Sequence, residues 1–292
     1  MIISLQFITF ALLLLLSLIN GYVIHNNLRF SNKYARNVAL SSTFEDDIEP
    51  MVSPSKSSNH LEERRPLKTA LLALAARTNR GQLATANEKD KAVNLVTQLE
   101  SFNPTETPCK SELIRGTWEL VFSTTYLFRS SPFFMAARAF CNEGDEADRF
   151  NMFCRLHYEA LAFTQIGKVS QIITESQFIS EFDTKVAIAP GLPINLSGTI
   201  RSISDIVDTS DDSLTLYMDK VTSKENSSNF GVINTIFNSY EGLSLRDLAS
   251  SLKAVNKNYK DPRPVFRTYY LDKHMRISRD QDDNIFVYNR IE

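Results

Sequence analysis

The amino-acid sequence predicts a mostly β, α+β fold, in which a closed antiparallel sheet of eight strands follows an N-terminal helical hairpin. Two observations lead to this prediction. The spacing of apolar residues changes from a helical repeat to a two-residue alternation near residue 113, and short turn-like segments separate successive alternating stretches. We expect the sheet to close into a barrel, because closure removes unpaired strand edges and leaves an interior for one small ligand.

The N-terminal residues have the composition of a targeting leader. Residues 5–19 form an uncharged apolar run, so we interpret 1–21 as a signal peptide. An uncleaved membrane anchor is the alternative, since the run is near the minimum length for spanning a bilayer. Residues 22–44 contain basic but no acidic residues, which is typical of a transit peptide, although a signal peptide followed by a flexible linker is also consistent with them.

A linker and a helical hairpin follow the leader. Residues 45–64 are rich in Ser, Pro and acidic residues and predict a disordered linker, so the folded domain is expected to span 65–292. Residues 66–78 have an apolar stripe at helical spacing, with Pro66 suited to the first turn. A second helix is predicted over 87–101, ending before Asn103-Pro104.

The rest of the chain alternates apolar and polar residues, and turn-like residues such as those at 190–193, 208–212 and 281–283 separate neighbouring stretches. Two apolar segments interrupt the series, 131–140 and 230–253, and predict helices that lie either at the barrel mouth or against its outer surface. The eight predicted strands span 113–124, 168–176, 177–189, 196–207, 213–221, 266–271, 275–279 and 284–290.

Composition argues against several classes of function. The net charge of -2 and the pI of about 6.1 provide no basic field, so nucleic acid is not an expected partner. The three cysteines have no C-x-x-C spacing, which predicts neither a disulfide framework nor a zinc site, and no metal or cofactor is expected.

Catalytic motifs are equally missing, so we predict that the protein is not an enzyme. His157 and His274 are the only histidines in the predicted folded domain. His157 and Glu159 form a conceivable acid–base pair, but a histidine with a structural role is the favoured interpretation.

One face of the predicted strands is apolar, and we expect it to line the barrel. The inward direction is chosen because the opposite face carries Glu181, Asp183, Arg201 and Asp205. Ordinary core packing is the alternative for each lining residue. The predicted ligand-binding residues are Phe122, Phe178, Phe182, Ile200, Leu214, Leu216 and Met218.

Several short motifs, taken together, carry a resemblance to a known family. Gly116-Thr117-Trp118 is the G-x-W pattern of lipocalin-type barrels, in which the tryptophan closes one end and a late-strand arginine stacks on it. The sequence also has TNRG at 78–81, GTWEL at 116–120, and YLD, MRISR and IFV at 270–272, 275–279 and 285–287. In this combination the chain resembles the plastid lipid-associated proteins, also called fibrillins.

The resemblance covers about residues 66–290 and implies a lipocalin-like barrel closed by Gly116, Trp118 and Arg276, with Arg290 as the competing partner of Trp118. It implies that the leader is a bipartite plastid address leading to the stroma, thylakoids or plastoglobules. The implied function is non-catalytic binding or organisation of prenylquinones, carotenoids or acyl lipids, with a membrane or lipid-droplet surface as a partner.

Two further functions stay open. The first is a scaffold or activator of a prenyl-lipid biosynthetic enzyme, with Phe133, Phe134 and Met135, or the region 233–245, as the contact surface. The second is an isoprenoid-modifying enzyme built on a lipocalin-type fold.

Overall fold

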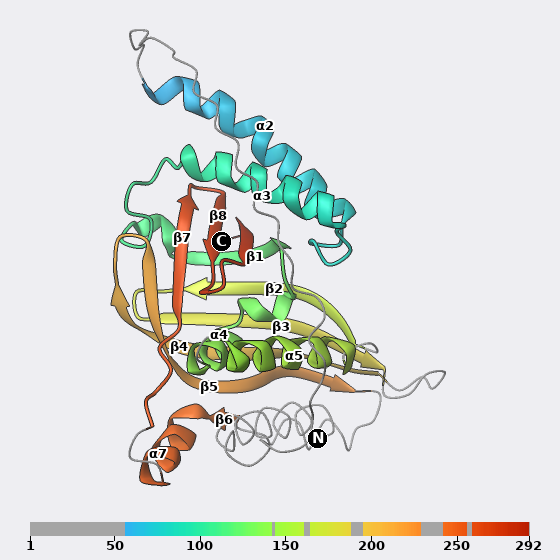
Figure 1. The fold of residues 1–292 in the computed structure, drawn as a ribbon, viewed down its shortest axis with the longest axis vertical. Helices are drawn as coiled ribbons and strands as arrows, with labels where there is room; N and C mark the ends of the chain where they lie inside the picture. Colours follow the sequence, from blue (N-terminus) through green and yellow to red (C-terminus); the bar gives the residue numbers. More distant parts are fainter. Residues whose placement is uncertain are drawn as a thin grey trace.

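The computed structural model describes residues 56–141, 144–160, 164–187, 195–228, 242–255 and 259–291. The predicted signal peptide and transit-like segment lie outside these ranges. Helices α2 and α3 cover one side of the sheet, and helices α4 and α5 lie over the strands β3 to β5 (Figure 1). No helix within the described ranges combines the length and apolarity that crossing a membrane requires.

The helical hairpin consists of α2 (Lys56–Arg77) and α3 (Ala86–Ser101). Thr85 caps α3 in a reciprocal capping box with Glu88, which satisfies two backbone N–H groups of the first turn. The helix begins at Lys56, within the segment predicted as a linker, and the placement of Pro66 in its first turn is wrong. The helix continues past Pro66 with the loss of one backbone hydrogen bond. Because Pro66 is exposed, water can solvate the backbone carbonyl that loses its partner.

The sheet has nine strands, and every pairing between them is antiparallel. All eight predicted strands are confirmed, seven of them within a few residues at their ends; β5 runs seven residues beyond its predicted end, and β6 is a short addition. The strands are β1 (Gly116–Ser123), β2 (Thr164–Ile173), β3 (Gln177–Ala187), β4 (Asn195–Thr209), β5 (Ser213–Ser228), β6 (Leu243–Ser244), β7 (Val265–Leu271), β8 (Met275–Arg279) and β9 (Ile285–Arg290).

The order of the sheet is β4-β3-β2-β1-β9-β8-β7-β5-β6, and β4 also pairs with β5. The pairing of eight strands therefore returns to its starting strand, and we call these eight the strand ring. It confirms an antiparallel α+β fold with the predicted strand neighbours. The β5–β7 pairing is short, joining residues 213–215 to residues 265–267.

The connections carry the other helical elements: η1 (Glu112–Ile114), η2 (Leu127–Ser130), α4 (Pro132–Phe140), α5 (Asp145–Ala160) and α7 (Leu245–Val255). The helix predicted over 131–140 is confirmed, with Ser131 as its N-cap. Of the segment predicted as helical over 230–253, residues 230–241 lie outside the described residues, and the remainder forms β6 and most of α7.

Two apolar cores occupy the two faces of the sheet. The outer core lies between the helical hairpin and the outward face of β1, β7, β8 and β9, and contains Leu71, Leu99, Ile277 and Val287. The inner core lies on the inward face of the strand ring and includes side chains from η2, α4 and α5. The candidate site is therefore a part of the inner core.

Candidate ligand site inside the strand ring

The inward face of the ring carries six of the seven residues predicted to line a cavity. Five of them are buried by at least nine-tenths in the inner core, and Ile200 packs against the same core while partly exposed. The opposite face is polar as expected, with Glu181 paired to Arg201 at 2.7 Å. Direct ligand contact by these six residues stays a prediction. They are Phe178, Phe182, Ile200, Leu214, Leu216 and Met218.

Phe122 faces the other way, so its predicted place among the inward residues is wrong. The register between β1 and β9 shifts between Leu120 and Phe122, which is a β-bulge. A bulge inserts one extra residue and reverses the alternation beyond it. Phe122 consequently packs in the outer core against the helical hairpin, whereas Leu120 stays in the inner core.

Trp118 lies inside the ring with no exposed surface, and its indole Nε1 donates a hydrogen bond to the carbonyl of Ile114 at 2.8 Å. Both arginines that were considered as its partner lie over it. The guanidinium carbon of Arg290 is 4.3 Å from the ring centroid, and that of Arg276 is 5.4 Å away. Arg290 also donates hydrogen bonds to the carbonyls of Lys273, Arg115 and Leu113, so it fastens η1 beneath the indole.

Arg276 lies deeper and is fully buried. Its guanidinium carbon is 4.2 Å from the centroid of Tyr288 and 5.3 Å from that of Phe266, and Nη2 donates to the side-chain oxygen of Gln171. Burial lowers the pKa of Arg276 to about 10, which still leaves the group charged at neutral pH. Arg276, the arginine predicted to close the barrel with Trp118, is therefore a buried cation surrounded by aromatic rings.

The space within the ring is filled by η2 and α4, residues 127–140, which we call the plug. Phe128, Phe133, Phe134 and Met135 are all buried in the inner core. The carbonyl of Ser130 accepts a hydrogen bond from Gln171 at 2.8 Å. Since the apolar side chains of α4 point into the core, the expectation that 133–135 form a contact surface for a partner is wrong.

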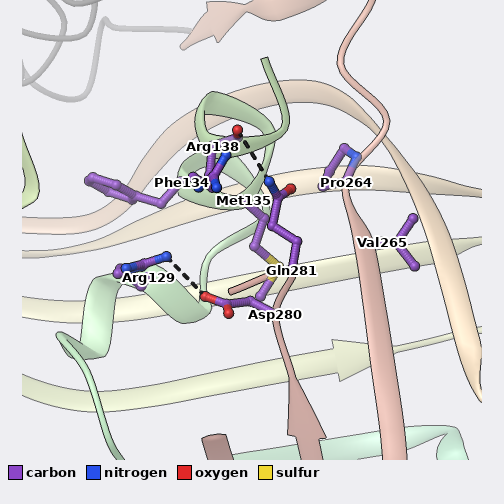
Figure 2. A pocket seen from close by; sticks show the side chains of 8 residues that line it. All are labelled: Arg129, Phe134, Met135, Arg138, Pro264, Val265, Asp280 and Gln281. Atoms are coloured by element: carbon purple, nitrogen blue, oxygen red, sulfur yellow. Dashed lines mark hydrogen bonds and ion pairs between the residues drawn. The ribbon is translucent and has the colours of Figure 1, made fainter. Parts of the chain in front are cut away.

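A network of ion pairs fixes the plug to the β8–β9 turn. Arg129 pairs with Asp280 at 3.2 Å and with Asp282, and Arg138 pairs with Asp282 at 2.8 Å. Figure 2 shows Arg129 reaching Asp280, with Gln281 donating to the carbonyl of Arg138 beside them. The hollow between these side chains measures only about 10 Å³, the space of one water molecule. The sequence signal for this network was weak: two arginines in an otherwise apolar segment.

A larger hollow of about 230 Å³ opens at the end of the ring where Trp118 lies. Ile114, whose carbonyl holds the indole, is one of its walls. Drug-sized ligand pockets usually measure about 300 to 1,000 Å³, so this hollow suits a fragment of a lipid rather than a whole one. Its lining consists of Cys109, Lys110, Ser111, Ile114, Arg115, Ile173, Thr174, Glu175, Ile206, Thr209 and Leu214.

The surroundings of His157 do not support acid–base chemistry with Glu159. His157 is buried on α5, with its ring 4.7 Å from that of Phe128 and 5.3 Å from that of Phe134. Burial lowers its pKa to about 4, so the imidazole is neutral at physiological pH. Glu159 is exposed, and its carboxylate lies 3.7 Å from Arg155.

The three cysteines are free and buried, and burial raises the pKa of each thiol to about 11 or 12. Such thiols are poor nucleophiles at neutral pH. Within the described ranges, no group of three or more His, Cys, Asp or Glu residues is arranged to hold a metal ion.

Comparisons with known proteins show the family of the chain. The PAP_fibrillin family model matches residues 65–289, which is most of the chain. The chain belongs to the PAP/fibrillin family. "Probable plastid-lipid-associated protein 5, chloroplastic" of Arabidopsis thaliana is 36% identical over 64 residues, covering 22% of this chain and 27% of that protein. The aligned part is thus about a quarter of the relative's length, and no solved structure matches the chain.

Proposed function

We propose that this fibrillin is a non-catalytic plastid protein that binds or organises apolar lipids, such as prenylquinones, carotenoids or acyl lipids. The strand ring is then a closed lipocalin-like barrel with Trp118 and Arg290 at its closed end. The observation that carries the proposal is the inward face of β3 and β5, where bulky apolar side chains are sheltered from water. Membership of the PAP/fibrillin family supports the same function.

Binding inside the ring requires the plug to move, because its phenyl groups occupy the space that a lipid chain needs. The lipid chain replaces the apolar contacts that the ring loses, whereas exposure of the plug's own apolar side chains opposes binding. Burial of a lipid contributes about 25 cal/mol per Å² of apolar area, less the cost of rearranging the plug. The proposed lipid is therefore held by apolar contacts on the ring and released when the plug returns.

Lipid extraction tests this function. The full-length protein, purified without detergent from plastids, is extracted with organic solvent and its lipids are identified by mass spectrometry. We expect a stoichiometric apolar lipid, and rebinding of that lipid to the delipidated protein. A protein that is empty when isolated and ignores prenylquinones, carotenoids and fatty acids refutes the proposal.

The plastid location is part of the proposal and rests on the leader composition and on the name of the relative. A C-terminal fluorescent fusion of the full chain is expected to accumulate in plastids, at plastoglobules, thylakoids or in the stroma. Fluorescence in the extracellular medium contradicts this location and indicates a secreted carrier.

A scaffold or activator of a prenyl-lipid biosynthetic enzyme is the second candidate function, and one surface favours it. On α5, Met152 and Leu156 lie one turn apart and are 55% and 44% exposed, although the same helix buries its other face. Affinity capture from plastid extract separates the candidates. A single enzyme recovered at stoichiometric yield, and lost with Met152→Glu/Leu156→Glu, favours the scaffold; unchanged recovery excludes this surface.

A further inference from the structure

Arg276 differs from the other buried arginines in having no acidic partner. Arg129 and Arg138 are comparably buried, and each pairs with an aspartate of the β8–β9 turn. Among the described residues, Arg276 is in no ion pair, and only its Nη2 has a hydrogen-bond acceptor. Its Nε and Nη1 donors are buried without a partner. Such a group is costly, since a buried charge is normally paired and its donors satisfied.

The closure of the ring does not explain this cost. Arg290 lies closer to Trp118 than Arg276 does, and it already bonds the backbone carbonyls of η1. A methionine or leucine at position 276 would fill the same space among Trp118, Phe266 and Tyr288 without a buried charge. A buried guanidinium with unsatisfied donors is an arrangement that a bound anion would satisfy.

Two more polar groups without partners lie in the same part of the ring. The hydroxyls of Ser180 and Tyr288 are buried and make no hydrogen bond with described residues, although Ser130 and Gln171 lie beside the Tyr288 hydroxyl. Tyr288 is the cross-strand neighbour of Arg276, and Ser180 is the neighbour of Gln171, which holds Nη2. Donors from β3, β8 and β9 thus surround one position inside the ring.

We propose that Arg276 binds the carboxylate of a long-chain fatty acid, whose alkyl chain takes the place of the plug against the inward face of β3 and β5. This inference rests on the proposed lipid-binding function and specifies the class of lipid. A carboxylate that displaces Gln171 from Nη2 can accept two parallel hydrogen bonds from the guanidinium, one from Nη2 and one from Nε or Nη1, which are already without partners. The aromatic rings around it exclude water, which strengthens the charge-assisted hydrogen bonds.

Gln171 connects this position to the plug. Its side-chain oxygen accepts from Arg276, and its Nε2 donates to the carbonyl of Ser130 at 2.8 Å. A carboxylate that takes over the guanidinium competes with Gln171 and frees it from Arg276. Ser130 ends η2 and directly precedes the N-cap of α4. Binding of the carboxylate and displacement of the plug therefore both change the hydrogen bonds that join Arg276, Gln171 and the carbonyl of Ser130.

The chain offers its own probe for this proposal, because Trp118 is the single tryptophan and lies beside Arg276. Delipidated full-length protein is titrated at pH 7.5 with 9,10-dibromostearic acid or its methyl ester, and bromine quenching of Trp118 is measured. We expect the acid to bind at least about tenfold more tightly than the ester, the effect of one charge-assisted hydrogen bond.

Two variants identify the arginine. Arg276→Met is expected to bind acid and ester equally, and Arg276→Lys to bind the acid with intermediate affinity, because it keeps the charge but loses the planar fork. The control is Arg279→Met on the same strand, whose guanidinium faces outward to Glu100 at 2.8 Å; it is expected to keep the preference for the acid.

The outcomes separate the two proposals. If neither ligand binds to the wild-type protein, lipid binding itself is refuted and the inference with it. If both bind with equal affinity, lipid binding stands and the carboxylate site is refuted. A preference for the acid that survives in Arg276→Met, with that variant folded by circular dichroism, also refutes it. Should Arg276→Met not fold, the comparison of acid with ester in the wild type and in Arg276→Lys decides the question.

Discussion

Two arginines lie over the single tryptophan, and their surroundings give them different roles. Arg290 is partly exposed and bonds three backbone carbonyls, so it joins η1 to the end of β9. Arg276 is enclosed by aromatic rings, and its Nε and Nη1 have no hydrogen-bond acceptor among the described residues. A stacked arginine contributes about 0.5 to 2 kcal/mol through its cation–π contact. We attribute the closure of the ring to Arg290 and leave Arg276 for the ligand.

His157 provides a pH-dependent test at the same scale. The unfolded chain takes up a proton near pH 6.5, whereas burial keeps the folded imidazole neutral down to about pH 4. Between these values the unfolded state binds more protons, so the stability of the fold decreases as the pH falls. A shift of this size amounts to roughly 3 kcal/mol across the window.

We expect urea unfolding of His157→Phe to depend less on pH between 6.5 and 4 than that of the wild type. The phenyl ring suits the site because Phe128, Phe134 and Phe153 surround it. His274→Phe is the control, since it makes the same change of side chain at an exposed histidine away from this site. Identical profiles for the wild type and His157→Phe would show that the imidazole is not held neutral.

At the residue scale, the sequence favoured Arg276 over Arg290 as the partner of Trp118, whereas in the structure both guanidinium groups lie over the indole and that of Arg290 is closer. The G-x-W pattern and a late-strand arginine are visible in the sequence, and Trp118 does lie beneath one. Both Arg276 and Arg290 lie at inward positions of their strands, and only the three-dimensional register shows that Arg290 is directly opposite Trp118. That no carboxylate of the described residues pairs with Arg276 has no signal in the sequence.

At the scale of elements, the turn after α2 and the bulge in β1 fit one another. Asn79, Arg80 and Gly81 have φ angles of 47°, 59° and 87°, and the carbonyl of Arg80 accepts a hydrogen bond from the backbone of Ser123. The bulge turns Phe122 outward against Gly81. Alternation alone placed Phe122 inside, because a bulge leaves no periodic trace in a strand of this length.

The fit predicts that Gly81→Ala is strongly destabilising. A β-carbon at this position would lie 2.9 Å from Cε2 of Phe122 and even closer to the carbonyl oxygen of Ser123, in a backbone conformation that alanine disfavours. We expect a loss of about 3 kcal/mol or more in the free energy of unfolding, measured with urea. Gly144→Ala is the matched control, with φ of 74° and no atom within 4 Å, and should cost only about 1 to 2 kcal/mol.

The plug shows a second limit of sequence reasoning about elements. Its apolar composition predicted a helix correctly but suited a helix at the mouth and one on the outer surface equally well. What fixes it inside is the pairing of Arg129 and Arg138 with Asp282, between residues more than 140 positions apart. Alternation and composition report local structure, so they carry no trace of such a contact.

We therefore expect Asp282→Asn to loosen the plug. Loss of the carboxylate leaves two arginines with weaker partners and costs roughly 2 kcal/mol, because Asp282 is partly exposed. Labelling of the buried thiols Cys141 and Cys154 by a disulfide reagent should become about tenfold faster. Asp283→Asn, one residue along the same turn, keeps both ion pairs and should label at the wild-type rate. Equal rates in the two variants would show that the network does not restrain the plug.

At the scale of the molecule, the shortest ladder of the strand ring joins β5 to β7, and we call this pairing the seam. Strands β3 and β4 pair along the whole of β3, whereas β5 and β7 pair only over residues 213–215 and 265–267. Two further backbone hydrogen bonds flank this pairing, from Leu216 to Pro264 and from Thr268 to Asp212. A ring that admits a lipid chain has to open somewhere, and the shortest ladder has the fewest hydrogen bonds to break.

Amide hydrogen exchange measures this opening directly. The amides of Leu216 and Thr268 cross the seam and belong to fully buried residues, so only separation of β5 from β7 exposes them to water. We expect these amides to exchange at least about tenfold faster than those of Phe178 and Ser180, which are equally buried in the β3–β4 ladder. A bound fatty acid that holds β5 and β7 together is expected to slow exchange of the Leu216 and Thr268 amides. It should therefore reduce the difference in exchange rate between these amides and those of Phe178 and Ser180. Equal protection in both ladders would mean that the ring opens as one cooperative unit, and that a lipid must enter past the plug without parting the strands.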